Sequence, residues 1–107
     1  MSFALTIRTA EDRKAQALAD HAAAVAALVD ARVEGQARAL GYNSAAHLAS
    51  YTASSVPDWA AEARAFVAWR DAVWLAVFEA RARAEAEGTA PSPAAILERL
   101  PGWSGKR

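Results

Sequence analysis

The sequence predicts an all-α domain built from two long helices and two short ones. Alanine, the residue with the highest intrinsic helix propensity, is very abundant, whereas there are only 5 glycines and 4 prolines. Strand-forming residues with period-two alternation occur only at positions 3–7, a run too short to build a sheet. We therefore expect the long helices to pack as an antiparallel hairpin with the short helices against it, an arrangement that also allows a helical oligomer.

Composition limits the classes of function. The chain has 107 residues, enough for a single domain with a modest core. Lys+Arg and Asp+Glu balance at 12 each, so the positive excess typical of nucleic-acid binding is missing. The absence of cysteine excludes disulfides and thiolate metal sites. No apolar run approaches the roughly 20 residues that span a bilayer, and the start does not resemble a secretory signal. We expect a soluble, cytoplasmically made protein that binds neither nucleic acid nor a membrane.

The first long helix is predicted from Thr9 to about Leu40. Thr9 followed by Asp12 resembles a capping box, and Gly41 is a residue type that commonly ends a helix. Residues 1–8 are then expected to form an N-terminal arm. The larger apolar residues of the helix make a thin stripe: Leu18, Val25, Val29, Val33 and Leu40. Leu18, Val29 and Leu40 are eleven positions apart, a spacing that keeps the stripe on one side of a nearly straight helix.

A short helix is predicted for residues 44–53. Asn43 or Ser44 can cap its start, because a side-chain oxygen there accepts a hydrogen bond from a free N–H group of the first turn. His47 and Tyr51 are four positions apart and therefore share a face of this helix.

The second long helix is predicted for residues 57–87. Pro57 suits its first turn, Ser55 its N-terminal cap and Gly88 its C-terminal cap. At 100° per residue its large apolar residues form two adjacent stripes: Trp59, Phe66, Val73 and Val77 in one, and Val67, Trp74 and Phe78 in the other. Trp69 flanks the first stripe. A helix that is apolar around more than half of its circumference needs cover on more than one side.

A last short helix is predicted from Pro93, with Ser92 as its cap, to Leu100. Its apolar residues dock it against the long helices: Ile96, Leu97 and Leu100. Residues 101–107 are expected to be a mobile tail, in which Trp103 either packs back on the helices or stays mobile.

Catalytic and metal-binding patterns are missing from the sequence. His21 and His47 have no acid at a zinc-like helical spacing, and Ser54 and Ser55 are not part of a Gly-x-Ser-x-Gly pattern. The glycines are too dispersed for a phosphate-binding loop. We therefore predict no catalytic residue, no metal site and no cofactor, and we expect that the protein is not an enzyme.

Arg70 projects close to the middle of the first apolar stripe. A guanidinium there must find a carboxylate, carbonyl groups or an aromatic face, because an unpaired buried charge is costly. The structural interpretation is an ion pair with Asp30 or Glu34 of the first helix, or stacking on a tryptophan. The functional interpretation is contact with a partner.

The excess of aromatic residues is the strongest functional signal. The candidate surface, which acts either as core or as a partner contact, comprises Tyr51, Trp59, Phe66, Trp69, Arg70, Val73, Trp74 and Phe78. The first helix offers mostly alanine and valine opposite these side chains, so either the short helices or another chain must cover the second stripe. That other chain could be a second copy or a different protein.

Two segments resemble a known family. IRTAEDRKAQALA, residues 7–19, is similar to the opening of small alanine-rich proteins encoded beside tail-fibre genes in tailed phages and prophages. Residues 41–74 resemble a recurring block of these proteins, which begins Gly-Tyr-Asx-Ser and here ends with Ala-Phe-x-Ala-Trp-Arg-Asp-Ala-Val-Trp from Ala65 to Trp74. APSPAAILERLP matches their proline-flanked last helix. Asn43 stands where aspartate is more usual.

The resemblance implies a phage tail accessory protein that binds a tail fibre or another tail protein, as an assembly chaperone or as a minor part of the virion. It implies neither an enzyme nor a cofactor. It places the protein in the host cytoplasm during assembly, or in the virion tail. The alternative is a helical self-association module that forms a homo-oligomer and has no specific client.

Overall fold

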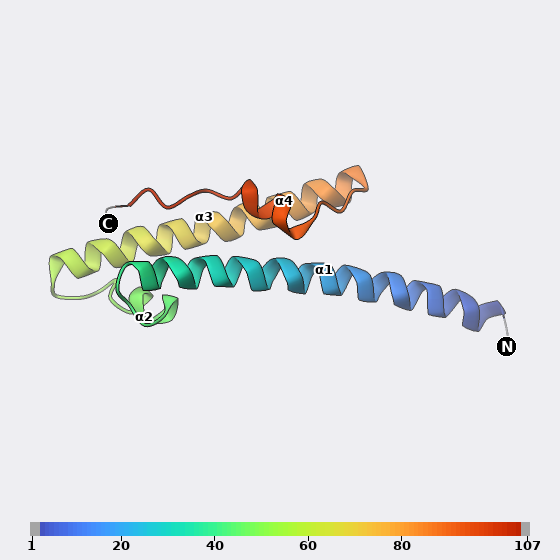
Figure 1. Cartoon of the computed structure of the whole chain (residues 1–107), viewed down its shortest axis with the longest axis horizontal. Coiled ribbons are helices and arrows are strands. Elements are labelled where there is room, and N and C mark those ends of the chain that lie inside the picture. The colour runs from blue at the N-terminus through green and yellow to red at the C-terminus, as the bar shows by residue number, and fades with distance from the viewer. Residues whose placement is uncertain (1–2, 106–107) are drawn as a thin grey trace.

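The computed structural model describes residues 3–105 and the side chains of residues 9–105. It contains helices α1 (Phe3–Ala39), α2 (Ala45–Ala49), α3 (Pro57–Glu87) and α4 (Pro93–Glu98). Helices α1 and α3 run antiparallel, α2 packs at the end where they are joined, and α4 returns along α1 (Figure 1). The predicted all-α class, with two long and two short helices, is confirmed, and the described residues form no strand.

The molecule is an elongated rod. It measures 66 × 25 × 19 Å and has a radius of gyration of 18.6 Å, whereas a compact domain of this length has a radius of gyration of about 13 Å. The N-terminal half of α1 accounts for the difference, because it projects beyond the other helices (Figure 1). Side chains 9–20 in this half are all exposed.

Helix α1 begins earlier than the sequence pattern indicated. It starts at Phe3, so the expected start at Thr9 is wrong, and residues 3–8 continue the helix instead of forming a separate arm. A capping signal only suggests where a helix can begin, and residues 3–8 contain neither glycine nor proline to stop the helix from starting earlier. At the other end Gly41 has the left-handed φ of 96° expected of a residue that stops a helix.

The core lies where the two long helices meet the short ones. Its buried apolar side chains come from all four helices and from the turns after α1 and α4: Val25, Val29, Val33, Ala37, Leu40, Leu48, Ala63, Phe66, Val73, Val77, Ile96 and Leu100. The predicted stripe of α1 is thus buried from Val25 to Leu40. Leu18, its first member, is 60% exposed because it lies in the projecting half.

Helix α2 closes the joined end of the hairpin. Ser44 is its N-terminal cap, with Oγ accepting a hydrogen bond from the backbone N–H of His47 at 3.0 Å. A carboxylate oxygen of Glu34 on α1 accepts another from the N–H of Ala45, also at 3.0 Å. The helix is shorter than predicted because residues 50–53 form turns.

Helix α3 has the bounds that the sequence predicts. It ends at Gly88, whose φ of 68° is again left-handed. Its N-terminal cap, however, is Val56 without a side-chain hydrogen bond, so the assignment of this role to Ser55 is wrong. Ser54 supports the turn before the helix instead, because its Oγ accepts a hydrogen bond from the N–H of Val56 at 3.1 Å.

The C-terminal segment is tied to the long helices by hydrogen bonds from their side chains. Each donor lies on α1 or α3 and each acceptor is a backbone oxygen: His21 to Pro91 (2.7 Å), Arg32 to Leu97 (2.9 Å) and Trp69 to Pro101 (3.0 Å). Since a carbonyl oxygen can only accept, Nε2 of His21 carries the hydrogen. Ser92 caps α4 as predicted, accepting from the N–H of Ala95 at 3.2 Å.

Replacing Phe66 by alanine tests the core. Phe66 is completely buried, so we expect the free energy of unfolding to fall by about 3–5 kcal/mol. Leu75 on the same helix is 66% exposed, and Leu75→Ala should change it by no more than about 0.5 kcal/mol. Urea unfolding followed by circular dichroism measures both, and equal losses would contradict the described packing.

Candidate functional site: an aromatic groove beside Trp59

The aromatic face predicted from the sequence separates into core and surface. Phe66 and Val73 are completely buried and belong to the core. Trp59 and Phe78 are 51% and 53% exposed. The remaining members are half-buried: Tyr51, Trp69, Arg70 and Trp74. The second stripe is therefore only partly covered, because α4 and the tail do not hide Phe78.

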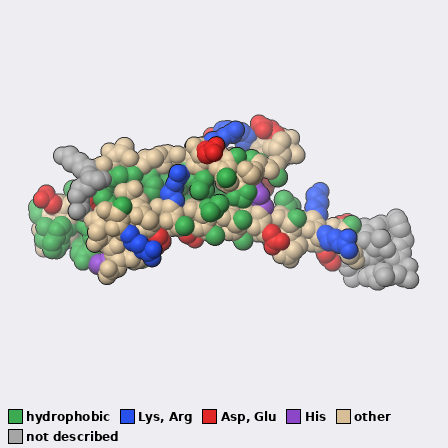
Figure 2. All heavy atoms as spheres, in the orientation of Figure 1, with side chains coloured by type: hydrophobic (Ala, Val, Ile, Leu, Met, Phe, Trp, Pro, Cys, Tyr) green, Lys and Arg blue, Asp and Glu red, His purple; other side chains and the backbone are tan. Residues whose placement is uncertain are grey.

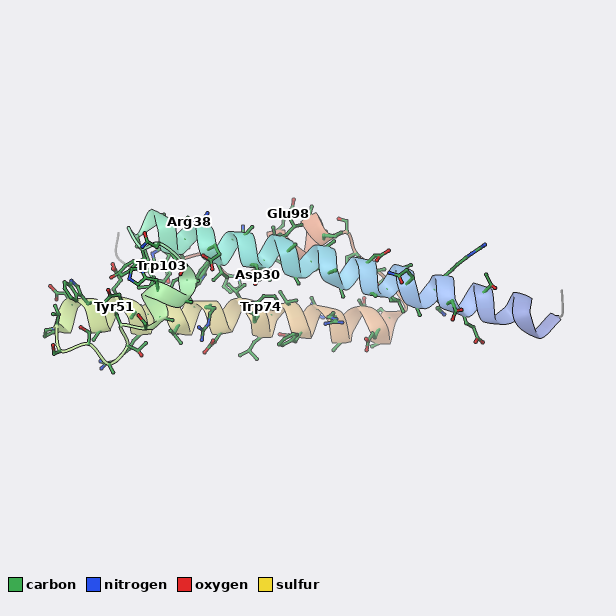
Figure 3. The ribbon with its side chains drawn as sticks, turned by 90° about the horizontal axis from the view of Figure 1, so that it is seen from below. Asp30, Arg38, Tyr51, Trp74, Glu98 and Trp103 are labelled. Carbon is green, nitrogen blue, oxygen red and sulfur yellow. The ribbon has the colours of Figure 1, made fainter. Side chains whose placement is uncertain are left out.

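Aromatic rings form three groups along the rod. The first surrounds the start of α3, with neighbouring ring centroids 5.4 to 5.8 Å apart: Tyr42, His47, Tyr51 and Trp59. The second joins α3 to the tail at 5.8 to 6.4 Å: Phe66, Trp69 and Trp103. The third is the pair Trp74–Phe78 at 6.1 Å. Figure 3 shows Tyr51 and Trp103 near the joined end of the hairpin and Trp74 further along α3.

An open groove of about 710 Å³ lies beside Trp59. Two alanines on α3 leave space between larger side chains, and the aromatic rings and two carboxylates complete the lining: Tyr42, Asp58, Trp59, Ala61, Glu62, Ala65 and Trp103. We call this depression the Trp59 groove.

The exposure of Trp59 corrects the expectation that it belongs to a buried stripe. Helix α3 begins beyond the end of α1 (Figure 1), so α1 does not reach across the first turn of α3. Tyr51 contacts the indole there, with the two rings in a T-shaped arrangement 5.8 Å apart. One side of the indole is therefore supported while the other faces the groove and solvent.

The groove combines aromatic faces with negative charge. The hydroxyl of Tyr42 donates a hydrogen bond to a carboxylate oxygen of Glu62 at 2.9 Å, which holds both side chains at the wall. Asp58 lies exposed in the first turn of α3. Figure 2 shows hydrophobic side chains with acidic ones beside them at this end of the rod. Aromatic faces and carboxylates both attract cationic groups, so this lining suits a polypeptide segment with apolar and basic side chains.

His47 supports the groove from behind. Its Nδ1 accepts a hydrogen bond from the backbone N–H of Asn43 at 3.4 Å. The hydrogen is therefore on Nε2, which donates to the hydroxyl of Tyr51 at 3.2 Å. Because Tyr51 contacts Trp59, this arrangement positions the indole.

Arg70 does not form the ion pair that the sequence suggested. Its guanidinium binds the adjacent Asp71, with Nη2 2.9 Å and Nε 3.1 Å from Oδ1, and its side chain is 35% exposed. The expected pairing with Asp30 or Glu34 is wrong. The long arginine side chain reaches the flank of the helix, where its charge is partly solvated, so no carboxylate from α1 is required.

Of the seven residues that line the groove, only Trp59 belongs to the surface predicted from the sequence. The other six were not predicted there: Tyr42, Asp58, Ala61, Glu62, Ala65 and Trp103. Tyr42 directly follows the helix stop at Gly41, a position whose side chain often packs back on the helix, and this was the available signal. Trp103 packs back on α3, which is one of the two arrangements expected for it, the other being a mobile side chain. Its Nε1 is buried and, among the described residues, has no hydrogen-bond partner.

Comparisons of the chain with protein-family models, with curated proteins and with solved structures found no match. Within residues 3–105, no group of three or more His, Cys, Asp or Glu side chains is arranged to hold a metal ion. In that same part of the chain neither long helix has a stretch apolar enough to cross a bilayer.

Replacing Arg70 by methionine tests the assigned ion pair. The pair with Asp71 is partly exposed, with side chains 35% and 56% accessible, and such pairs contribute at most about 1 kcal/mol. We expect Arg70→Met to change the free energy of unfolding by no more than that amount, measured by thermal melting at neutral pH. A loss of several kcal/mol would instead indicate a buried carboxylate left without its partner.

Proposed function

We propose that this protein is a phage tail accessory protein that binds a tail fibre or another tail component through the Trp59 groove. The observation that supports this most is the half-exposed indole of Trp59, which lies in a groove lined mainly by residues 41–74. Six of the seven lining residues fall within residues 41–74, the block that resembles the phage proteins, and Trp103 is the seventh.

The lining also fits the way proteins bind one another. Tryptophan is among the residues that contribute most to binding energy when a partner covers it, especially in a concave site. Trp59 and Trp103 offer apolar area for a side chain of the client, while Asp58 and Glu62 can pair with a basic residue at the rim. A client segment would thus cover an indole that the chain itself leaves in water.

Two roles are compatible with such binding. An assembly chaperone covers apolar fibre surfaces in the host cytoplasm until the fibre trimerises, and then leaves. A minor structural part stays attached in the virion tail. Mass spectrometry of purified virions distinguishes them, because the chaperone is absent from virions and the structural part is present.

Replacing Trp59 by alanine tests the groove. With the chain co-expressed with a phage tail-fibre protein, we expect the wild type to co-purify with the fibre protein. Trp59→Ala should reduce the retained fibre protein about tenfold or more, because it removes the central apolar contact. Leu75→Ala is the matched control, since Leu75 is a similarly exposed apolar residue of α3 outside the groove.

Both variants should keep the wild-type melting temperature within a few degrees, because each changes a side chain that is at least half exposed. Normal capture by Trp59→Ala would show that the groove is not the contact. No capture by the wild type would favour the alternative, a helical self-association module without a client. The exposed projecting half of α1 is the observation in favour of that alternative.

A further inference from the structure

The projecting half of α1 extends past the other helices (Figure 1). Side chains 9–20 are all exposed, and a helix of this length is only marginally stable in water by itself. The chain exposes 7288 Å², about 1,600 Å² more than a compact monomer of its mass. This excess belongs to the whole elongated chain, and it is larger than the roughly 800 Å² that a standard interface buries on each partner.

Residue types in this half are sorted by face. Three side chains continue the register of the buried stripe, because each stands eleven positions before a residue on the bundle side of α1: Glu11, Lys14 and Leu18. Alanines flank them at Ala10, Ala15 and Ala17. Beyond Leu18 the same face meets the bundle, where His21 and Ala22 are half-buried. The opposite side is polar: Asp12, Arg13, Gln16 and Asp20. Figure 2 shows acidic and basic side chains along this part of the rod.

We propose that this face binds the same face of a second copy, with the two helices antiparallel. The two-fold axis crosses the contact at the level midway between residues 12 and 13 of each helix. In this arrangement Glu11 of each copy is level with Lys14 of the other, so the contact contains two opposite-charge pairs. The flanking alanines allow the helix backbones to approach closely, because they place no long side chain between them.

The order of the charges selects the antiparallel orientation. In a parallel pair in register, Glu11 would face Glu11 and Lys14 would face Lys14, and both contacts are repulsive. The proposed dimer uses a surface at the opposite end of the rod from the Trp59 groove. It therefore does not depend on the proposed tail function, and either idea can fail without the other.

Charge reversal tests the dimer. We expect sedimentation equilibrium of the full chain to show a dimer with a dissociation constant below about 100 µM. Glu11→Lys and Lys14→Glu should each weaken association at least tenfold, because each creates two like-charge contacts, and the double variant should return to within about threefold of the wild type. A monomeric wild type, or a double variant as weak as the single ones, would overturn the proposal.

Asp12→Lys is the matched control, because it makes the same change of charge on the polar side of the same helix turn. It should leave the dissociation constant within about twofold of the wild type. A loss as large as that of Glu11→Lys would show that total charge, and not the proposed face, governs association. All these positions lie outside the buried core, so the variants should fold.

A single spin label determines the orientation. The chain has no cysteine, so Ala27→Cys, at an exposed position of α1, provides one labelling site. At 1.5 Å per residue, the antiparallel dimer places the two labels about 45 Å apart, whereas a parallel pair in register places them within about 20 Å. Double electron–electron resonance measures this distance, and the shorter value would overturn the proposed arrangement.

Discussion

The large side chains of α3 face a helix that offers mainly alanine and valine, and this difference in size determines the architecture. A stripe of small residues covers one side of α3 but cannot enclose Phe66, whose completely buried ring needs neighbours in more than one direction. The C-terminal segment supplies them: Ile96 and Leu100 join the core, and Trp103 packs against Phe66. The hydrogen bonds from His21, Arg32 and Trp69 then fix the path of this segment.

The two long helices are also offset, and both candidate contact surfaces arise from that offset. Helix α3 begins beyond the end of α1 (Figure 1), which leaves Trp59 without cover from α1 and forms one wall of the groove. Helix α1 in turn extends well past the rest of the bundle, and its exposed half carries Glu11, Lys14 and Leu18. The middle of the rod supplies stability, while each end has a surface available for another chain.

The sequence predicts which side of each helix faces the core, but not where along the helix the neighbouring chain stops. The proline and glycine at the ends of α3 correctly indicate its bounds, and the periodicity of α1 correctly identifies the stripe from Val25 to Leu40. The same periodicity wrongly placed Leu18 and Trp59 with the buried residues. Both occupy core-facing positions of their helices, but no partner helix lies opposite them.

The groove was only partly predictable for a related reason. Trp59 belongs to the aromatic set that the sequence identified, and Tyr51, also in that set, supports its indole. Tyr42 comes from the connection after α1 and Trp103 from the segment after α4, so they meet only after the chain has reversed direction twice. A local sequence pattern cannot predict contacts between residues so far apart in the chain. The large side chains of α3 and the small ones of α1 did indicate that a further segment must pack on α3.

The proposed dimer would place the two grooves far apart. Tyr42 is about 30 residues along the helical rod from the two-fold axis, so at 1.5 Å per residue the grooves lie about 90 Å from each other. One client segment could not occupy both, and each dimer would hold two client chains at separate ends. Two linked sites strengthen binding only when one partner can occupy both at the same time. The dimer would therefore bind a client more tightly than one copy does only if the client carried two binding segments that are also about 90 Å apart.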